Sequence, residues 1–125
     1  MHYNKLTLRH FEYPHCAGEL SGTAVRRGAA GSLGKGAWVQ FDLDIDPRDP
    51  ARKVRAARFL AFGCPHVIAV ADWVAQAAAG REATSSLPES VQSLRERFDV
   101  PIEKTGRLLV IEDAWIAAVS PPCRD

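Results

Sequence analysis

Alternation between apolar and polar residues predicts two strands near the middle of the chain. Between Trp38 and Ile45 every second residue is apolar, and the residues between them are Gln40, Asp42 and Asp44. This pattern is typical of a strand with one buried face and one wet face. Residues 46–50 contain two prolines and three charged side chains, which predicts a turn. A second strand is then predicted over Val54–Phe62, with Ala56, Leu60 and Phe62 facing inward, so that the two strands form a β-hairpin.

Apolar residues at helical spacing predict four helices around these strands. The first runs from Tyr3 to Phe11 and ends before Pro14. A longer apolar helix begins at Pro65, which suits a first helical turn, and continues to Ala79 with Gly80 as its stop.

Two further helices follow in the last third of the chain. Ser86 and Glu89 have the spacing of a capping box and predict the start of a short helix, whose apolar stripe is Val91, Leu94 and Phe98. After a connector at residues 100–102, the last helix is predicted from about Thr105 to Val119.

The segment between Gly18 and Gly36 is rich in glycine. Within it, residues 23–25 predict a short edge strand. The glycines at positions 28, 31, 34 and 36 predict a flexible loop. The order of helix, strands and helices predicts an α+β fold in a single domain over residues 1–125. We expect a small antiparallel three-stranded sheet that packs against helices on one face.

Composition and charge exclude several classes of protein. The 125 residues are 46% hydrophobic and 25% charged, as in soluble globular chains, and the net charge is +1. Nothing in this charge balance indicates a nucleic-acid or membrane surface. The first residues lack the apolar core of a signal peptide, so we expect a cytoplasmic protein. Three cysteines at positions 16, 64 and 123 argue against a disulfide framework, and we expect Cys16 and Cys123 to be incidental.

Several segments, in order and at compatible spacing, carry a resemblance to a known family. These segments are residues 8–18, the loop at residues 31–36 with the strand that follows it, residues 57–69 and residues 112–118. The sequence resembles the IscU/NifU-N-terminal type of iron–sulfur cluster assembly scaffold, and the most specific match is Arg58-Phe59…Phe62-Gly63-Cys64, which is similar to the family's "DARFKxxGCxxxIA". The resemblance implies the sandwich fold shared by IscU-type and SufE-type proteins.

The resemblance also implies where a cluster would be held, and most of those positions have changed. Family scaffolds bind a [2Fe–2S] cluster with three cysteines, helped by an Asp or a His. Of the ligand cysteines only Cys64 is kept. The other two fall on Lys35 and Arg107, while the Asp falls on Ala37 and the His on Gly106. We therefore expect no resident cofactor, and a [2Fe–2S] cluster or iron only if another chain or a small thiol completes the partial ligand set.

The replacement of ligands by cations predicts a different chemistry. If the fold matches the family, Lys35 and Arg107 lie near Cys64 and favour its thiolate form. The candidate site is therefore Cys64 as a sulfur acceptor, with a binding surface formed by Lys35, Gly36, His66, Gly106 and Arg107. The alternatives are a small buried cysteine, solvated surface cations and an exposed first-turn histidine at position 66.

Three functions remain open at this stage. The first is a divergent scaffold-like protein that acts in cluster or sulfur trafficking through partner binding. The second is a SufE-like sulfur acceptor with a persulfide on Cys64, and the third is a binding or regulatory module that has lost the chemistry. We expect no enzymatic activity beyond sulfur acceptance. By resemblance, the expected partner is a cysteine desulfurase or an Hsp70-type chaperone system, for which residues 100–104 fall where the family carries "LPPVK".

Overall fold

A three-stranded antiparallel sheet in the order β1-β2-β3 forms one layer of the molecule, and its helices α2 and α4 form the other. The computed structural model describes residues 2–120. Its elements are α1 (Lys5–Glu12), β1 (Val25–Ser32), β2 (Ala37–Ile45), β3 (Val54–Phe62), α2 (Pro65–Ala78), α3 (Val91–Arg97), the 3₁₀ helix η1 (Ile102–Lys104) and α4 (Thr105–Val119). The predicted α+β class and sheet are confirmed.

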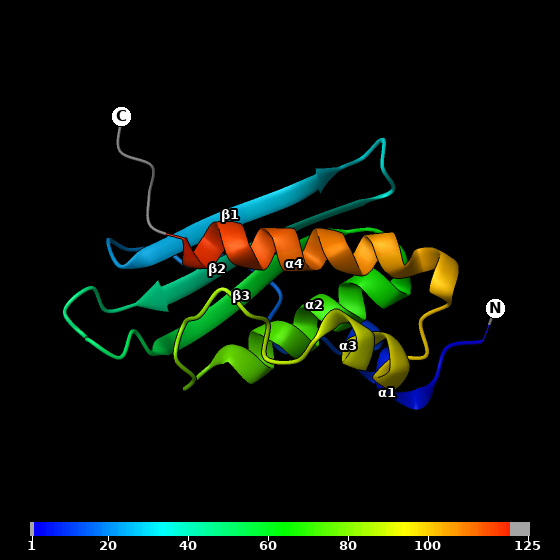
Figure 1. The fold of residues 1–125 in the computed structure, drawn as a ribbon, viewed down its shortest axis with the longest axis horizontal. Coiled ribbons are helices and arrows are strands. Elements are labelled where there is room, and N and C mark those ends of the chain that lie inside the picture. Colours follow the sequence, from blue (N-terminus) through cyan, green and yellow to red (C-terminus); the bar gives the residue numbers. More distant parts are fainter. Residues whose placement is uncertain (1, 121–125) are drawn as a thin grey trace.

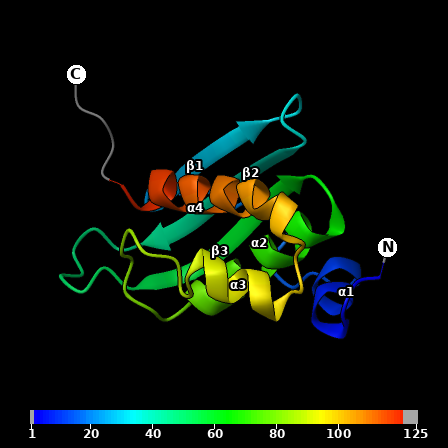
Figure 2. The ribbon, with the colours of Figure 1, turned by 45° about the vertical axis from the view of Figure 1, so that its right-hand side comes forward.

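The helices lie in a defined order over the sheet. Helix α4 crosses β1 and β2, and helix α2 packs on β3 (Figure 2). Helices α1 and α3 pack outside them, α1 on α2 and α3 on α4. His10 of α1 and Asp72 of α2 join the first pair through a buried contact of 2.7 Å between Nδ1 and Oδ2. No helix in residues 2–120 is long and apolar enough to cross a membrane.

The hairpin, the Pro65 helix and the last helix follow the sequence prediction closely. Strands β2 and β3 pair antiparallel, with Phe41 opposite Phe59. Helix α2 has Pro65 in its first turn and ends next to Gly80, whose φ of +84° is a conformation that glycine adopts at little cost. Helix α4 spans the predicted Thr105–Val119.

The strand predicted at residues 23–25 begins only at Val25 and extends to Ser32, through two of the glycines predicted to form a loop, whereas Gly34 and Gly36 lie in the turn that follows. Strand β1 runs through Gly28 and Gly31 and pairs with β2 along its whole length. A Cβ at Gly28 would lie 2.1 Å from the backbone nitrogen of Ala118, so the absence of a side chain lets α4 approach the strand. Gly31 has a φ of +88°. These two glycines therefore serve close packing and local backbone geometry rather than flexibility.

The side chains of β3 face the opposite way from the prediction at three positions. Ala57 and Phe59 are buried and belong to the hydrophobic core. Phe62, predicted inward, is 50% exposed, and Ala56 and Leu60 are only partly buried. The register with β2 explains the error, because residues directly opposite each other share a face and Phe59 opposes the buried Phe41.

The predicted wet face of β2 also holds a buried charge. Asp42 is 1% exposed and accepts hydrogen bonds from the Arg27 guanidinium at 2.7 Å and from the backbone N–H of Leu20 at 2.9 Å. Burial opposes ionisation of this carboxyl group, but these bonds outweigh it and lower its pKa.

The third helix begins later than predicted. Its N-cap is Ser90, whose hydroxyl accepts from the N–H of Ser93, so the capping box expected at Ser86 is wrong. The segment before it is instead tied to α4, because the Trp115 indole N–H donates to the carbonyl of Thr84 at 2.9 Å. Two of the three residues of the predicted apolar stripe, Leu94 and Phe98, are buried, and Val91 is partly buried.

Candidate functional site

Cys64 lies at the junction between β3 and α2, at the end of the sheet. It is the N-cap residue of α2 and is partly exposed. Gly63 makes the junction possible, since its φ is +156° and a Cβ there would lie 3.1–3.2 Å from the Val67 side chain. The chain therefore places a sulfur atom at the amino end of a fourteen-residue helix, where unpaired N–H groups and the helix dipole favour negative charge.

The surroundings of this sulfur favour its thiolate. Burial alone would raise the pKa of the Cys64 thiol. The backbone N–H groups of Val67 and His66, the Arg107 guanidinium and the charge of Lys104 act the other way and lower it overall. A partly exposed cysteine with a lowered pKa is the state in which a thiol acts as a nucleophile at neutral pH.

The two cations that act on Cys64 come from the start of α4. Arg107 is in the first turn of that helix, and Lys104 is its N-cap residue. The turn between β1 and β2 adjoins the same place, because a Cβ at Gly36 would lie 3.8 Å from Nη2 of Arg107. Segments that are far apart in sequence therefore meet at Cys64. Lys104 was not predicted from the sequence, although its position three residues before Arg107 puts both on one side of a helical turn.

Two other predicted site residues, Lys35 and Gly106, are both exposed. Lys35 is exposed in the turn between β1 and β2, and its charge is not among the influences on the Cys64 pKa. Gly106 is exposed in the first turn of α4, and a Cβ there would meet nothing within 4 Å. The structure thus brings Arg107 and the Gly36 turn together near the sulfur, while Lys35 is an exposed residue of the same turn.

His66 is buried, which contradicts both its assignment to the binding surface and the alternative of an exposed first-turn histidine. It is 2% exposed, and the Tyr3 ring packs edge-on against it with the ring centroids 4.7 Å apart. Neither ring nitrogen has a hydrogen-bond partner. Burial lowers the pKa of His66, and Lys104 and Arg107 lower it further against the opposing charge of Asp99. The reason for the error is tertiary: the segment that precedes α1 covers this ring.

Cys16 provides an internal comparison for Cys64. It is 7% exposed, and its backbone N–H donates to Asp72 at 2.8 Å. Burial and the negative charge of Asp72 raise the pKa of its thiol, despite the opposing effect of Arg58. Of the two cysteines in the described part of the chain, Cys64 alone has a lowered pKa. Cys123 lies outside the described residues.

The residues around Cys64 do not fit a [2Fe–2S] cluster held by this chain alone. Such a cluster needs four ligands, mainly thiolates. Within residues 2–120 no group of three or more His, Cys, Asp or Glu side chains could hold a metal ion. Arg107, which the family resemblance matches to a ligand cysteine, interacts with the sulfur as a cation and cannot donate an electron pair to iron.

The segment at residues 100–104 lies between α3 and α4, next to the site. Val100 is buried, Pro101 precedes the 3₁₀ helix, and Ile102 is 73% exposed. The segment therefore connects two helices and at the same time presents one large apolar side chain to solvent.

A hollow of about 420 Å³ lies at the other end of the sheet, between the start of β1 and the end of α4. Thr23, Arg26, Pro47 and Ala117 are among its lining residues. Cys64 is at the opposite end of β3 from this hollow. The chemistry of the sulfur is therefore separate from it.

Comparison with known proteins identifies the class of this fold. Over 94% of the chain, the structure superposes on a candidate iron–sulfur cluster assembly scaffold protein for the SUF system from Fervidobacterium islandicum, covering 96% of that chain with a TM-score of 0.67 and 12% identity. A NifU-like protein (N-terminal) from Brucella abortus gives a TM-score of 0.65 with 18% identity, covering 93% of this chain and 90% of that one. Identities this low establish the shared fold alone.

The sequence itself defines the family. Residues 2–121 match the family described as the NifU-like N terminal domain. The chain belongs to this family, as the resemblance of its motifs predicted. No curated protein sequence matches it closely enough to count as a relative.

Proposed function

We propose that this chain serves iron–sulfur cluster assembly by accepting and passing on sulfur at Cys64, and that it does not build a cluster on its own. Membership of the NifU-like family supports the link to cluster assembly. The observation that carries the proposal is the position of Cys64, a partly exposed sulfur at the amino end of α2 with Arg107 against it and a lowered pKa.

The reaction is a transfer between sulfur atoms with no net oxidation. The Cys64 thiolate attacks the outer sulfur of a donor persulfide, R–S–SH, and forms a new S–S bond. The S–S bond of the donor breaks, and its electron pair leaves with the inner sulfur as the thiolate R–S⁻. Cys64 then carries the persulfide Cys64–S–SH. Arg107 and the N–H groups of α2 favour the anion on this sulfur before the transfer and on the persulfide after it.

The partner that fits this role is a protein that generates a persulfide, of which a cysteine desulfurase is the chemical type. An Hsp70-type chaperone is the second partner that the family resemblance suggests, and the exposed Ile102 between α3 and α4 is a feature such a protein could bind. We place this proposed role in the cytoplasm, as expected from the sequence.

Mass spectrometry tests the proposal directly. Incubation with a cysteine desulfurase and L-cysteine should add about 32 Da, one sulfur atom, to the peptide that contains Cys64. The variant Cys64→Ser should show no such addition, and serine is a good N-cap residue, so the start of α2 should persist. The Cys16 peptide is the internal control. Failure of the wild-type chain to gain sulfur, or an equal gain in Cys64→Ser, would refute sulfur acceptance at this site.

Anaerobic incubation with iron and sulfide tests the other half of the proposal. We expect no visible absorption from a [2Fe–2S] cluster on the chain by itself, because one thiolate cannot hold it. A coloured monomer with one cluster per chain would instead support a scaffold role. If the chain takes up neither sulfur nor a cluster but binds the desulfurase, the binding-module alternative remains.

A further inference from the structure

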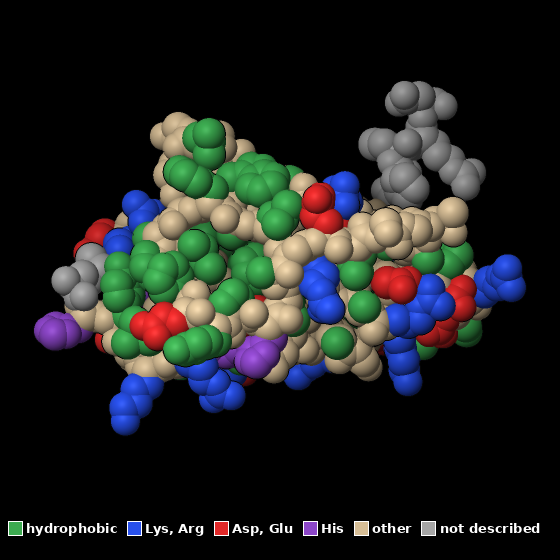
Figure 3. Space-filling view, turned by 180° about the vertical axis from the view of Figure 1, so that it is seen from behind, with side chains coloured by type: hydrophobic (Ala, Val, Ile, Leu, Met, Phe, Trp, Pro, Cys, Tyr) green, Lys and Arg blue, Asp and Glu red, His purple; other side chains and the backbone are tan. Residues whose placement is uncertain are grey.

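The face of the sheet that no helix covers carries apolar side chains at the Cys64 end. Trp38 and Phe62 oppose each other in β2 and β3, and Leu60 follows on the same face. Phe62 is 50% exposed, and Trp38 and Leu60 are partly exposed. In Figure 3, which views the molecule from behind, hydrophobic side chains gather over this end of the sheet. We call Trp38, Leu60 and Phe62 the apolar patch.

The patch adjoins two exposed features of the turn between β1 and β2. Leu33 in this turn is 69% exposed, and Lys35 beside it is exposed as well. Cys64 follows Phe62 by two residues, a span of at most about 7 Å along the chain. A protein seated on the patch would therefore cover the sulfur or lie directly beside it.

The size of the patch favours a transient partner. An aromatic side chain has about 200 Å² of surface, so the half-exposed Phe62 offers roughly 100 Å², and even three fully exposed side chains of that size would offer only about 600 Å². A stable interface needs about 800 Å² from each partner. The patch can therefore anchor a contact but is too small to hold a permanent dimer by itself.

The charges beside the patch favour an acidic partner over a second copy of this chain. Lys35 and Arg107 form no ion pair with a carboxylate in residues 2–120. Two copies that met through this end would bring these cations toward each other, which costs free energy. A partner with carboxylates around an apolar contact would complement both features.

We propose that the apolar patch is the docking surface for the protein that donates sulfur to Cys64, a transient partner with an apolar contact bordered by carboxylates. This inference rests on the proposed function, because it assigns the surface from which that transfer occurs. The exposed aromatic ring of Phe62 is the anchor, and the cations at positions 35 and 107 speed and orient the encounter.

A comparison of two sulfur donors distinguishes an effect on partner docking from an effect on the sulfur-transfer step. A cysteine desulfurase with L-cysteine is a protein donor, and glutathione persulfide is a small donor that needs no docking surface. We expect Phe62→Ser to lower the rate of transfer from subsaturating desulfurase about tenfold, with the rate at saturation and the transfer from glutathione persulfide unchanged. The matched control is Ile116→Ser, which removes a side chain of similar exposure, 39%, from α4. Circular dichroism and the rate of Cys64 alkylation show whether each variant is folded.

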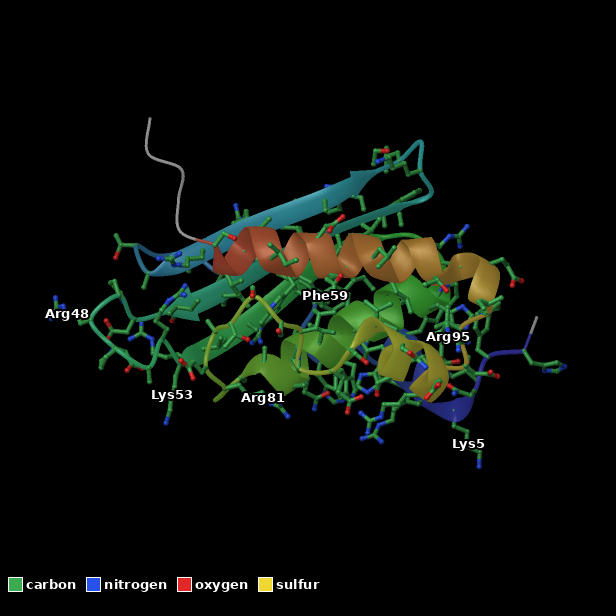
Figure 4. All side chains as sticks on the ribbon, in the orientation of Figure 1. Lys5, Arg48, Lys53, Phe59, Arg81 and Arg95 are labelled. Atoms are coloured by element: carbon green, nitrogen blue, oxygen red, sulfur yellow. The ribbon has the colours of Figure 1, made fainter. Side chains whose placement is uncertain are left out.

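A second pair of variants tests whether the positive charge beside the apolar patch contributes to docking. Lys35→Glu should raise the desulfurase concentration needed for half-maximal transfer and weaken its dependence on salt. Lys53→Glu makes the same charge change near the start of β3, at the far end from the first turn of α4 (Figure 4), and should have little effect.

The outcomes are distinct for the two proposals. If the wild-type chain takes sulfur from neither donor, the proposed function fails and the docking surface fails with it. If it takes sulfur from both, and Phe62→Ser either matches the wild type with both donors or loses both equally, sulfur acceptance stands and the docking surface is wrong. Loss of desulfurase transfer alone, with Ile116→Ser unaffected, supports the docking surface.

Discussion

The effect of Arg107 on the reactivity of Cys64 gives the sharpest test of the site. Substitution Arg107→Gln keeps a hydrogen-bond donor and most of the side-chain length but removes the positive charge. A hydrogen bond to a charged group contributes roughly 1.5–3 kcal/mol. Because Cys64 and Arg107 are both partly exposed, solvent screening reduces this to about 1 kcal/mol. That free energy corresponds to a factor of about five in the thiolate-to-thiol ratio.

The assay is alkylation of Cys64 as a function of pH, with the modified peptide quantified by mass spectrometry. Only the thiolate reacts, so the wild-type rate should reach half its plateau below the ordinary thiol value of about 8.5. Arg107→Gln should move the profile to higher pH and slow alkylation at neutral pH about fivefold, with similar plateaus at high pH. Arg48→Gln is the control, because Arg48 is exposed in the turn between β2 and β3, at the opposite end of the molecule (Figure 4).

Two results would contradict this reasoning. If the wild-type profile is centred at or above the ordinary thiol value, the surroundings of Cys64 do not favour its thiolate. If Arg107→Gln and Arg48→Gln have the same profile, Arg107 is not the cause of the lowered pKa.

Three further predictions concern the framework that positions the site. Gly28→Ala should destabilise the protein by about 1–3 kcal/mol in urea denaturation, because the new methyl group would overlap the backbone of α4. Gly34→Ala, whose Cβ would have no neighbour closer than 3.9 Å, is the control, and equal losses would exclude the overlap as the cause. Asp72→Ala should cost about 1–3 kcal/mol for each buried group that loses its hydrogen-bond partner, the His10 ring and the Cys16 N–H; a loss below about 1 kcal/mol in the same assay would contradict this. The pKa of Asp42 is lowered in the folded chain, so its ionisation stabilises the fold above about pH 4 and this contribution disappears on acidification. Asp42→Asn should therefore flatten the fall of the unfolding free energy between pH 6 and about pH 3, and an unchanged slope would show that other groups cause it.

The position of Cys64 was accessible from the sequence, whereas its full surroundings were not. The motif that ends in Gly63-Cys64, followed by Pro65, indicates a strand, a tight junction and a helix start, all of which are local features. The family resemblance also pointed to Arg107. Lys104 was not predicted as part of the site, because its influence on Cys64 depends on how the start of α4 is oriented over the sheet.

The burial of His66 and the exposure of Phe62 are also features that could not be predicted from neighbouring residues. Both residues lie within two positions of Cys64; an exposed His66 was one expectation from the sequence, and Phe62 was predicted to face inward. His66 is buried because Tyr3, more than sixty residues earlier, packs on it. Phe62 is exposed because the register of β3 against β2 puts Phe59 in the core instead.

By itself, the sequence determined the features that depend on neighbouring residues. The alternation in β2, the proline at the start of α2 and the bounds of α4 follow from local periodicity and backbone preference, which act within a few residues. Only the tertiary structure decided that the glycines of β1 form a strand beneath α4, that Lys104 acts on Cys64 together with Arg107, and that an apolar surface remains uncovered beside it. Each of these depends on the distance between segments far apart in the chain, which is fixed only when the whole core packs.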